Sequence, residues 1–481
     1  MFDVIIIGCG VVGAAAAYEL SKYDLSLALL ESENDVATGT TKANSAIIHA
    51  GYDPEPGTLM ARLNVQGNRL AGEICEKLDV PFKRIGSLVL AFDEPDMAHL
   101  RELYRRGTEN GVPDLQLLNA AKVRDMEPNT AENVAGGLFA PSAGIINPWE
   151  FALAMAETAV LNGAELHLNS AVTKITAIPG GFSLETALGE RFESRFVINA
   201  AGIHSGKIHT LVGGSDFGIN PVRGQYYLLD KSQGQLVNHV IFQCPTKDGK
   251  GVLVSPTVHG NLIVGPNYEP IETESRATTG KGLQYVAASS KKSVPSVSFR
   301  ENIRNFAGLR ACADKDDFIV EESPVAKGFF NLAGIKSPGL SAAPAIAVEA
   351  AALLKNAGVS LRPRSDYKNR SAVLRFERLT DGEKQQLIAE NPLYGRVICR
   401  CETITEGEIV NALHSPIPAV SIAGVKRRCN AGMGRCQGGF CSPRVCEIIS
   451  RELGIPPTEV LEDRFGSSLL TGQTKEGTDN V

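Results

Sequence analysis

Apolar runs and Ala-rich stretches alternate at the start of the chain. Residues 3–8 are mostly apolar and predict a strand buried on both faces, while residues 11–23 predict a helix packed on that strand. Residues 25–31 predict a second strand, which ends in an acidic side chain. These lengths are typical of a βαβ unit, in which a helix joins two parallel strands.

The later part of the chain continues this pattern in separate pieces. Two more apolar segments that end in glycine, residues 196–202 and 328–334, predict strands, and residues 342–354 predict an Ala-rich helix. Four further segments predict strands separated by Gly, Pro and Asn turns, and they are residues 80–92, 136–146, 219–230 and 250–266. We therefore expect an α/β protein with a Rossmann-like nucleotide-binding domain built from discontinuous segments and an inserted antiparallel α+β substrate domain.

The changes of pattern also predict domain boundaries. The nucleotide-binding domain takes residues 1–80, 140–215 and 300–360, and the substrate domain takes residues 81–139 and 216–299. The composition then turns charged in a connector, residues 361–392, followed by a small helical cysteine-rich domain, residues 393–465, and a tail, residues 466–481.

Length, charge and apolar content exclude several classes of protein. A chain of 481 residues predicts two or three domains, and 43% hydrophobic with 21% charged residues is ordinary for a globular protein. A net charge of −6 argues against general nucleic-acid binding. No apolar run is long enough to predict a transmembrane segment, although a peripheral membrane association stays open. Because no basic leader precedes the first apolar run, we expect a cytoplasmic protein.

A glycine motif follows the first predicted strand. Gly8, Gly10 and Gly13 fit G-x-G-x-x-G, in which the glycines allow a tight turn, close approach to a diphosphate and helix–strand contact. Glu31 lies about twenty residues further on, where an acid accepts hydrogen bonds from a ribose diol. This context predicts a dinucleotide site, with a ligand-free βα turn as the alternative.

Two features favour FAD over NAD. Residues 39–45 offer hydroxyl groups and backbone N–H groups to a cofactor that extends beyond the second strand. Residues 333–341 offer a second helix N-terminus, which suits negative charge on the N1–C2=O edge of a reduced flavin.

These motifs together carry a family resemblance. The glycine motif with Glu31, residues 39–51, Asn199-Ala-Ala-Gly202 and Gly308-Leu-Arg310 resemble the D-amino-acid-oxidase-type FAD superfamily over roughly residues 1–355. Within it, the chain resembles anaerobic-type glycerol-3-phosphate dehydrogenases and L-2-hydroxyglutarate dehydrogenases. The resemblance implies bound FAD and oxidation at a C–H bond that bears OH or NH. The FAD contacts that we expect are at Gly8, Gly10, Gly13, Glu31, Thr40, Thr41, Asn44, Ser45, Val172, Ala201, Gly202, Gly334, Lys336, Gly339, Leu340 and Ser341.

Such an oxidation needs a hydride acceptor at flavin N5, a base and a cation for an acidic substrate. We expect His49 to be the base, because a neutral imidazole titrates in the useful range; a buried histidine bonded to a backbone carbonyl is the alternative. Arg310 matches the substrate-anion arginine of the family, with a structural ion pair as the alternative. Arg223 is a second candidate cation. We expect Lys336 to lie beside the flavin edge and stabilise the reduced anion, with a solvated surface lysine as the alternative. Weaker candidates for the pocket are Tyr52, Arg62, His259 and Tyr268.

Six of the ten cysteines lie in the last fifth of the chain. Four of them, Cys399, Cys401, Cys436 and Cys441, form a C-x-C…C-x4-C pattern that suits a [2Fe–2S] cluster or a zinc ion. Residues 397–403, 424–428 and 432–441 resemble the bacterioferritin-associated-ferredoxin-like [2Fe–2S] domain, with a wider second spacing than the C-x-x-C of small ferredoxins. We expect Cys429 and Cys446 to be buried thiols, and the basic run 426–428 to be solvated surface or a guide for an acidic partner.

The leading hypothesis is an FAD and iron–sulfur dehydrogenase that oxidises sn-glycerol 3-phosphate to dihydroxyacetone phosphate. Electrons would leave through the cluster to a redox partner subunit or carrier. The fused cysteine domain supports this substrate, whereas residues 49–52 and 56–59 look like the 2-hydroxyglutarate enzymes and keep an L-2-hydroxy acid open. A non-catalytic flavin and iron–sulfur relay is the alternative from another class.

Overall fold

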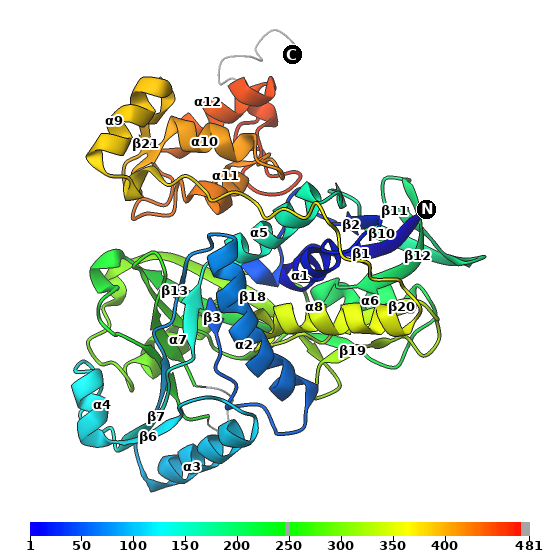
Figure 1. The fold of residues 1–481 in the computed structure, drawn as a ribbon. Coiled ribbons are helices and arrows are strands. Elements are labelled where there is room, and N and C mark those ends of the chain that lie inside the picture. The colour runs from blue at the N-terminus through cyan, green and yellow to red at the C-terminus, as the bar shows by residue number, and fades with distance from the viewer. Residues whose placement is uncertain (246–250, 473–481) are drawn as a thin grey trace, which may run out of the picture. The chain divides into compact units, whose positions relative to one another are not determined.

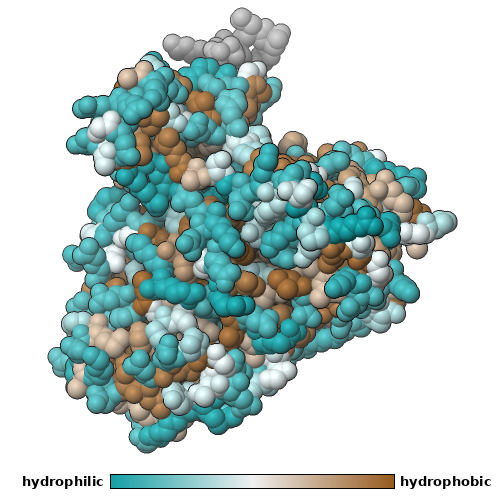
Figure 2. All heavy atoms as spheres, viewed as in Figure 1, coloured by the Kyte–Doolittle hydropathy of each residue, from teal (hydrophilic) through white to brown (hydrophobic). Residues whose placement is uncertain are grey.

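The computed structural model describes residues 1–245 and 251–472, which form two compact units (Figure 1). Unit 1 contains residues 1–32 and 36–371, and unit 2 contains residues 33–35 together with the chain from residue 372. Figure 2 shows hydrophilic side chains over much of the visible surface, with hydrophobic ones scattered among them. Among the described residues, no helix combines the length and apolar character that crossing a membrane requires.

The first sheet of unit 1 has eight strands and contains the predicted βαβ unit. Strand β1 pairs in parallel with β2 on one side and with β12 on the other, and β12 pairs in parallel with β20. The strands are β1 (Phe2–Ile7), β2 (Leu27–Leu30), β9 (Glu165–His167), β10 (Val172–Ile178), β11 (Gly181–Thr186), β12 (Arg191–Asn199), β19 (Ile319–Glu322) and β20 (Phe329–Ala333). The apolar residues of β1 are buried because a parallel sheet is covered on both faces.

Helices that pack on one another accompany this sheet (Figure 1). Helix α1 packs against α5 and α8, and α2 packs against α8. Their bounds are α1 (Val11–Leu20), α2 (Leu59–Lys77), α5 (Pro148–Leu161), α6 (Ser205–Thr210) and α8 (Gly339–Asn356). Residues 14–17 of α1 are buried alanines, whose small side chains let the neighbouring helices approach closely.

The second sheet of unit 1 has nine strands and is antiparallel except where β14 pairs with β5. The strands are β5 (Ser87–Ala91), β6 (Gln116–Asn119), β7 (Gly136–Ala140), β13 (Ile219–Leu229), β14 (Val240–Gln243), β15 (Leu253–Pro256), β16 (Leu262–Gly265), β17 (Glu269–Pro270) and β18 (Asn302–Ala313). Its helices are α3 (Glu94–Glu109), α4 (Ala120–Met126) and α7 (Gly280–Ser290). A small third sheet joins β3 (Ile47–Ile48), β8 (Gly144–Ile146) and β4 (Phe82–Lys83).

Unit 2 is mainly helical around its own apolar core. Its helices are α9 (Asp381–Glu390), α10 (Glu406–Leu413), α11 (Ile422–Cys429) and α12 (Ser442–Leu453), and its short strands are β21 (Val397–Cys399) and β22 (Ile404–Thr405). Thr405 caps α10 in a capping box with Glu408, which satisfies free N–H groups at the start of that helix.

The fold confirms the α/β class, the Rossmann-like domain and the antiparallel substrate sheet. It differs from the predicted boundaries at two places. Strand β18 lies in the expected nucleotide-binding segment 300–360, but it pairs along β13 in the second sheet. The expected connector 361–392 is divided, because residues up to 371 belong to unit 1 and α9 belongs to unit 2. Most of the predicted tail, residues 473–481, and residues 246–250, which include the first residue of the predicted strand 250–266, lie outside the described residues.

Candidate active site and cysteine centre

The glycine motif forms a tight turn between β1 and α1. Gly8 has a φ of +96°, and a Cβ there would lie 2.7 Å from the carbonyl oxygen of Ala200, next to Ala201. A Cβ at Gly13 would overlap the carbonyl oxygen of Gly8. Only glycine fits at these two positions. The turn after β12 therefore packs directly against the glycine turn between β1 and α1. This is the close backbone approach that a diphosphate site requires.

Polar groups surround the same turn. The backbone N–H of Cys9 donates to Oε2 of Glu31 at 2.7 Å, and the N–H of Val11 donates to Oγ1 of Thr41 at 2.9 Å. Glu31 is buried at the end of β2, so the predicted ribose acid lies beside the predicted diphosphate turn. The donor groups at the start of α1 and the cradle that a Cβ would fill fit the diphosphate and ribose of FAD.

The loop of residues 39–46 connects this turn to the second sheet. Thr40 donates its hydroxyl to the carbonyl of Leu309 at 2.6 Å, and the Ser45 hydroxyl lies 3.2 Å from the Tyr226 hydroxyl. The amide of Asn44 donates to the Thr41 carbonyl at 2.8 Å, which braces the loop internally. A Cβ at Gly308 would overlap the carbonyl oxygen of Ala43, so the loop lies directly on β18.

His49 is fixed between two helices and the second sheet. Its backbone N–H donates to Oγ of Ser341 at 2.7 Å, and its carbonyl accepts a bond from the amide of Asn68 at 2.9 Å. Its ring stacks on Phe242 of β14, with 5.7 Å between ring centroids. His49 is therefore joined to the start of α8, where the flavin ring was expected.

The start of α8 faces this region with free donors. No side chain caps the helix at Pro338, and the turn before it passes through Gly334 with a φ of +64°. A Cβ at Gly67 of α2 would overlap the Ser341 carbonyl oxygen, so α2 and α8 touch at this end. An uncapped helix N-terminus favours negative charge by about 0.3–1 kcal/mol, as expected for the edge of a reduced flavin.

Arg310 carries the clearest unsatisfied charge of the site. Its Nη1 atom is buried and has no hydrogen-bond partner among the described residues. The guanidinium lies 6.0 Å from the ring centroid of Tyr268, and a Cβ at Gly224 on the facing strand would lie 2.9 Å from its Nη2 atom. A buried guanidinium nitrogen without a partner fits an anionic substrate group.

Cys312 lies two residues further along β18 and was missed by the sequence analysis. Burial raises the pKa of its thiol, while the charges of Lys336 and Arg310 act to lower that pKa. Both cations therefore lie within electrostatic reach of one side chain. The signal available in the sequence was the period of two along a strand, which places residues 310 and 312 on the same face.

Arg223 has a different environment. Its guanidinium pairs with both carboxylate oxygens of Glu269, at 3.2 and 3.0 Å, and donates to the carbonyl of Ala277 at 2.9 Å. The charge of this buried arginine is already compensated, which disfavours the predicted role of Arg223 as a second substrate cation.

The weaker candidates have structural partners of their own. The buried hydroxyl of Tyr52 lies 3.5 Å from that of Ser87, and Arg62 pairs with Glu349 at 2.9 Å. His259 lies 3.2 Å from the amide of Asn147. Val172 begins β10 opposite Thr186 and packs on the core of the first sheet.

The four predicted cysteine ligands come together in unit 2 as two pairs. The Sγ atoms of Cys401 and Cys436 are 3.7 Å apart. A hydrogen bond from the Cys441 thiol lowers the pKa of Cys399 to about 5, assisted by the N–H groups of Gly432, Glu402 and Cys401. Among residues 1–245 and 251–472, no three His, Cys, Asp or Glu side chains are placed to hold a single ion. Two thiol pairs suit the two irons of a [2Fe–2S] cluster better than one tetrahedral zinc ion.

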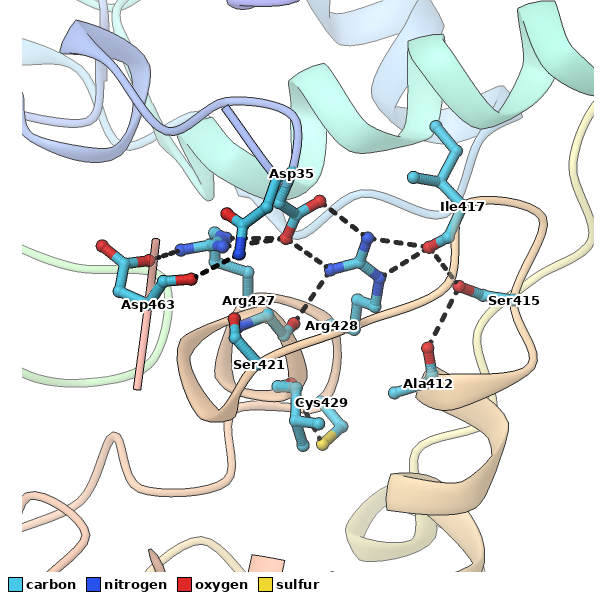
Figure 3. Close-up of polar contacts among 12 residues, drawn as sticks. Asp35, Ala412, Ser415, Ile417, Ser421, Arg427, Arg428, Cys429 and Asp463 are labelled. Carbon is cyan, nitrogen blue, oxygen red and sulfur yellow. Dashed lines mark hydrogen bonds and ion pairs between the residues drawn. The ribbon is translucent and has the colours of Figure 1, made fainter. Parts of the chain in front are cut away.

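The basic run 426–428 is largely buried in unit 2 (Figure 3). Arg427 donates to Asp35 at 2.8 Å and to Asp463 at 2.9 Å. Arg428 donates two bonds of 2.9 Å to Asp35 and also bonds the Ile417 carbonyl. The prediction that these two arginines are solvated surface or guide a partner is wrong, because a buried carboxylate neutralises them.

The two remaining cysteines of unit 2 are packed thiols. Cys446 is buried in the core, and half-buried Cys429 lies at the end of α11 with its thiol 3.4 Å from the Val425 carbonyl. Burial raises the pKa of both thiols, as expected for structural cysteines.

Comparison with known proteins places this architecture in a family. Residues 3–353 match the model of the FAD dependent oxidoreductase family, and residues 397–451 match the BFD-like [2Fe-2S] binding domain. The chain belongs to the FAD-dependent oxidoreductases. Members of this family bind FAD, so the expectation of FAD over NAD is confirmed, as is [2Fe–2S] over zinc for the C-terminal domain.

Three relatives of this FAD-dependent oxidoreductase extend the comparison. A glycerol 3-phosphate dehydrogenase of Caloramator mitchellensis is 51% identical over 477 residues, which cover 99% of each chain. An L-2-hydroxyglutarate dehydrogenase of Escherichia coli K12 is 32% identical over 56% of this chain and 64% of its own. The FAD-bound L-alpha-glycerophosphate oxidase of Mycoplasma pneumoniae matches with a TM-score of 0.74 and 33% identity, over 78% of this chain and 99% of its own.

Proposed function

We propose that this FAD-dependent oxidoreductase oxidises sn-glycerol 3-phosphate to dihydroxyacetone phosphate. The observation that carries the proposal is the partnerless, buried Nη1 of Arg310, with Lys336 acting on the same neighbouring thiol. A phosphate dianion needs several cations at one point, whereas a dicarboxylate needs one cation at each end. The full-length similarity to a glycerol 3-phosphate dehydrogenase supports the same substrate.

Bound FAD supplies the two-electron acceptor for the hydride, through N5 of its ring. Arg310 holds the phosphate, and His49 takes the proton of the substrate hydroxyl. The His49 backbone is held because its N–H donates to Ser341 and its carbonyl accepts from Asn68. The stack on Phe242 orients the ring, so that the ring does not have to be reordered on binding. Lys336 stabilises negative charge next to α8.

The [2Fe–2S] domain supplies a one-electron carrier, and we propose that electrons leave the protein through it. The thiol pairs Cys399–Cys441 and Cys401–Cys436 would each bind one iron. The electron acceptor is then a redox partner rather than a second substrate of the flavin site. Location in the cytoplasm stays a prediction.

Anaerobic titration of the purified holoenzyme tests the substrate. We expect sn-glycerol 3-phosphate to bleach the flavin absorbance at stoichiometric concentration, and L-2-hydroxyglutarate to leave it unchanged. Bleaching by the hydroxy acid alone would transfer the proposal to that class, and no bleaching by either would favour the non-catalytic relay.

A further inference from the structure

The two loops that carry the cysteine ligands expose a small basic and aromatic surface. Residues 399–403 and 432–441 contain three charged side chains, of which Arg400 and Arg435 are exposed and Glu402 is 7% exposed. Phe440 is 86% exposed although it precedes Cys441, a buried ligand. We propose that Arg400, Arg435 and Phe440, called the cluster face here, dock a small acidic one-electron carrier protein. The proposal rests on the electron route proposed above.

Each residue of the cluster face is next to a ligand thiol. Arg400 precedes Cys401, which is itself exposed, and Arg435 precedes Cys436. The two loops touch, because a Cβ at Gly434 would overlap the Cβ of Cys401. A carrier on this face would therefore lie against the exposed edge of the cysteine centre, where transfer over a short distance is possible.

The charge of the face selects the class of partner. The chain as a whole carries a net charge of −6, yet the exposed charged side chains of both ligand loops, Arg400 and Arg435, are cationic. The one carboxylate of these loops, Glu402, is buried with its Oε1 against Gly434. Arg427 and Arg428 are buried and add no exposed charge. Positive charge at the rim raises the association rate with an acidic protein and gives that rate a salt dependence.

Phe440 supplies the apolar contact of the face. A phenylalanine that is 86% exposed contributes little to the packing of unit 2, and aromatic and Arg side chains are enriched at interfaces. Redox encounters use small interfaces, which a single aromatic residue and two arginines suit. An anionic membrane needs more, since stable surface binding takes clusters of about four to eight basic residues.

The electron count fits a one-electron carrier. Oxidation of one substrate releases two electrons, and each docking event passes one electron to one carrier. For an FMN-containing flavodoxin, that electron and one solvent proton reduce the FMN by one equivalent. Two flavodoxin molecules are thus consumed for each substrate.

Stopped-flow mixing with an acidic flavodoxin tests the face. Holoenzyme is first reduced with dithionite, and the excess is removed, so that substrate chemistry plays no part. We expect the second-order rate of flavodoxin reduction to fall at least about tenfold between about 20 and 300 mM salt. Arg400→Glu and Arg435→Glu should each lower the low-salt rate about tenfold, and Phe440→Ala should weaken binding about tenfold by calorimetry.

Unit 2 offers matched controls outside both ligand loops. Arg464 is exposed and Phe465 is 87% exposed, so Arg464→Glu and Phe465→Ala repeat the same changes at residues that do not adjoin a ligand cysteine in the sequence. These two controls should leave rate and affinity unchanged. Iron–sulfur absorbance confirms that every variant retains its cluster.

Three results would overturn the docking proposal. If the cluster-face variants bind and reduce flavodoxin as the wild type does, the docking proposal is wrong. If the variants slow the reduction of the cluster but not its reoxidation by flavodoxin, electrons enter the cluster through this face rather than leave through it. Phe440-dependent binding to anionic phospholipid vesicles without flavodoxin binding would make the partner a membrane. If glycerol 3-phosphate fails to reduce the enzyme but the dithionite-reduced enzyme still reduces flavodoxin through this face, only the substrate assignment fails.

Discussion

Arg310 is the single side chain on which substrate binding depends most. We expect Arg310→Met to raise KM for sn-glycerol 3-phosphate about 100-fold, equivalent to about 3 kcal/mol, because the phosphate loses a charge-assisted bond. Steady-state kinetics with an artificial acceptor measures this effect. Exposed Arg300 gives the matched control, since Arg300→Met removes the same group outside the site. Equal effects in the two variants would contradict the role of Arg310.

His49 is predicted to act on the proton rather than on binding. His49→Ala should lower kcat about 10²–10⁴-fold with little change in KM, the range for general base catalysis. Added imidazole should restore part of the activity, a result that a purely structural role would not give. A variant that loses FAD and is not rescued would show that His49 only supports the fold.

For single residues, the sequence predicted the positions of those side chains whose role depends on spacing within one local motif. Gly8, Gly13 and Glu31 belong to one βαβ unit, so their positions follow from the motif. Arg223 is neutralised by Glu269, and Arg428 is neutralised by Asp35, which lies 393 residues away in the sequence. Such pairings are made by the tertiary fold and leave no local pattern.

Among the elements, the contact between β18 and the loop of residues 39–46 joins the nucleotide turn to the substrate sheet. Gly308→Ala should weaken FAD binding at least about tenfold, because the new methyl group overlaps the Ala43 carbonyl and overpacking costs about 1–3 kcal/mol. Fluorescence titration of the apoprotein with FAD measures it. Gly280→Ala is the control, since a Cβ there meets nothing within 4 Å. Unchanged FAD affinity in Gly308→Ala would contradict the contact.

Segment 33–35 is an element of unit 2 although it follows β2 in the chain. Asp35→Asn should destabilise unit 2 by about 3 kcal/mol, because buried Arg428 loses its counter-charge and buried Arg427 keeps only Asp463. Thermal melting followed by iron–sulfur absorbance measures this, and Asp381→Asn, with a 99% exposed side chain, is the control. Equal melting of the two variants would contradict the role of Asp35.

The same carboxylate sets a pH dependence. Burial raises the pKa of Asp35, but Arg428 and Arg427 outweigh it and hold the pKa well below the usual range. The stabilisation is therefore complete above the unfolded value of about 4, and it is lost as the pH falls below that value. The stability difference between wild type and Asp35→Asn should be constant from about pH 5 to 8 and shrink in stronger acid. A difference that grows on acidification would contradict this sign.

Element prediction followed the local pattern and missed long-range pairing. The buried strands and Ala-rich helices of the first sheet were predicted because their periodicity lies within each segment. The placement of β18 beside β13 joins residues that are 73 to 94 positions apart, from Leu229 and Asn302 to Ile219 and Ala313. Hydrophobic periodicity carries no information on which sheet a strand enters.

For the molecule as a whole, the two cofactors should be separable by mutation. Cys401→Ser removes one ligand of the proposed cluster and leaves unit 1 unchanged. We expect this variant to lose iron–sulfur absorbance, to keep flavin bleaching by glycerol 3-phosphate, and to lose electron transfer to a carrier. Retained transfer without a cluster would place the electron exit at the flavin.

The division into a flavin unit and a cysteine unit was predictable from the density of cysteines alone.

The amount of product formed under strictly anaerobic conditions measures how many electrons each chain accepts from the substrate. With excess sn-glycerol 3-phosphate and no acceptor, FAD takes two electrons and the cluster takes one. We expect about 1.5 molecules of dihydroxyacetone phosphate per chain in the wild type and about one in Cys401→Ser. Absence of this product, or about one molecule per chain in both proteins, would contradict this expectation.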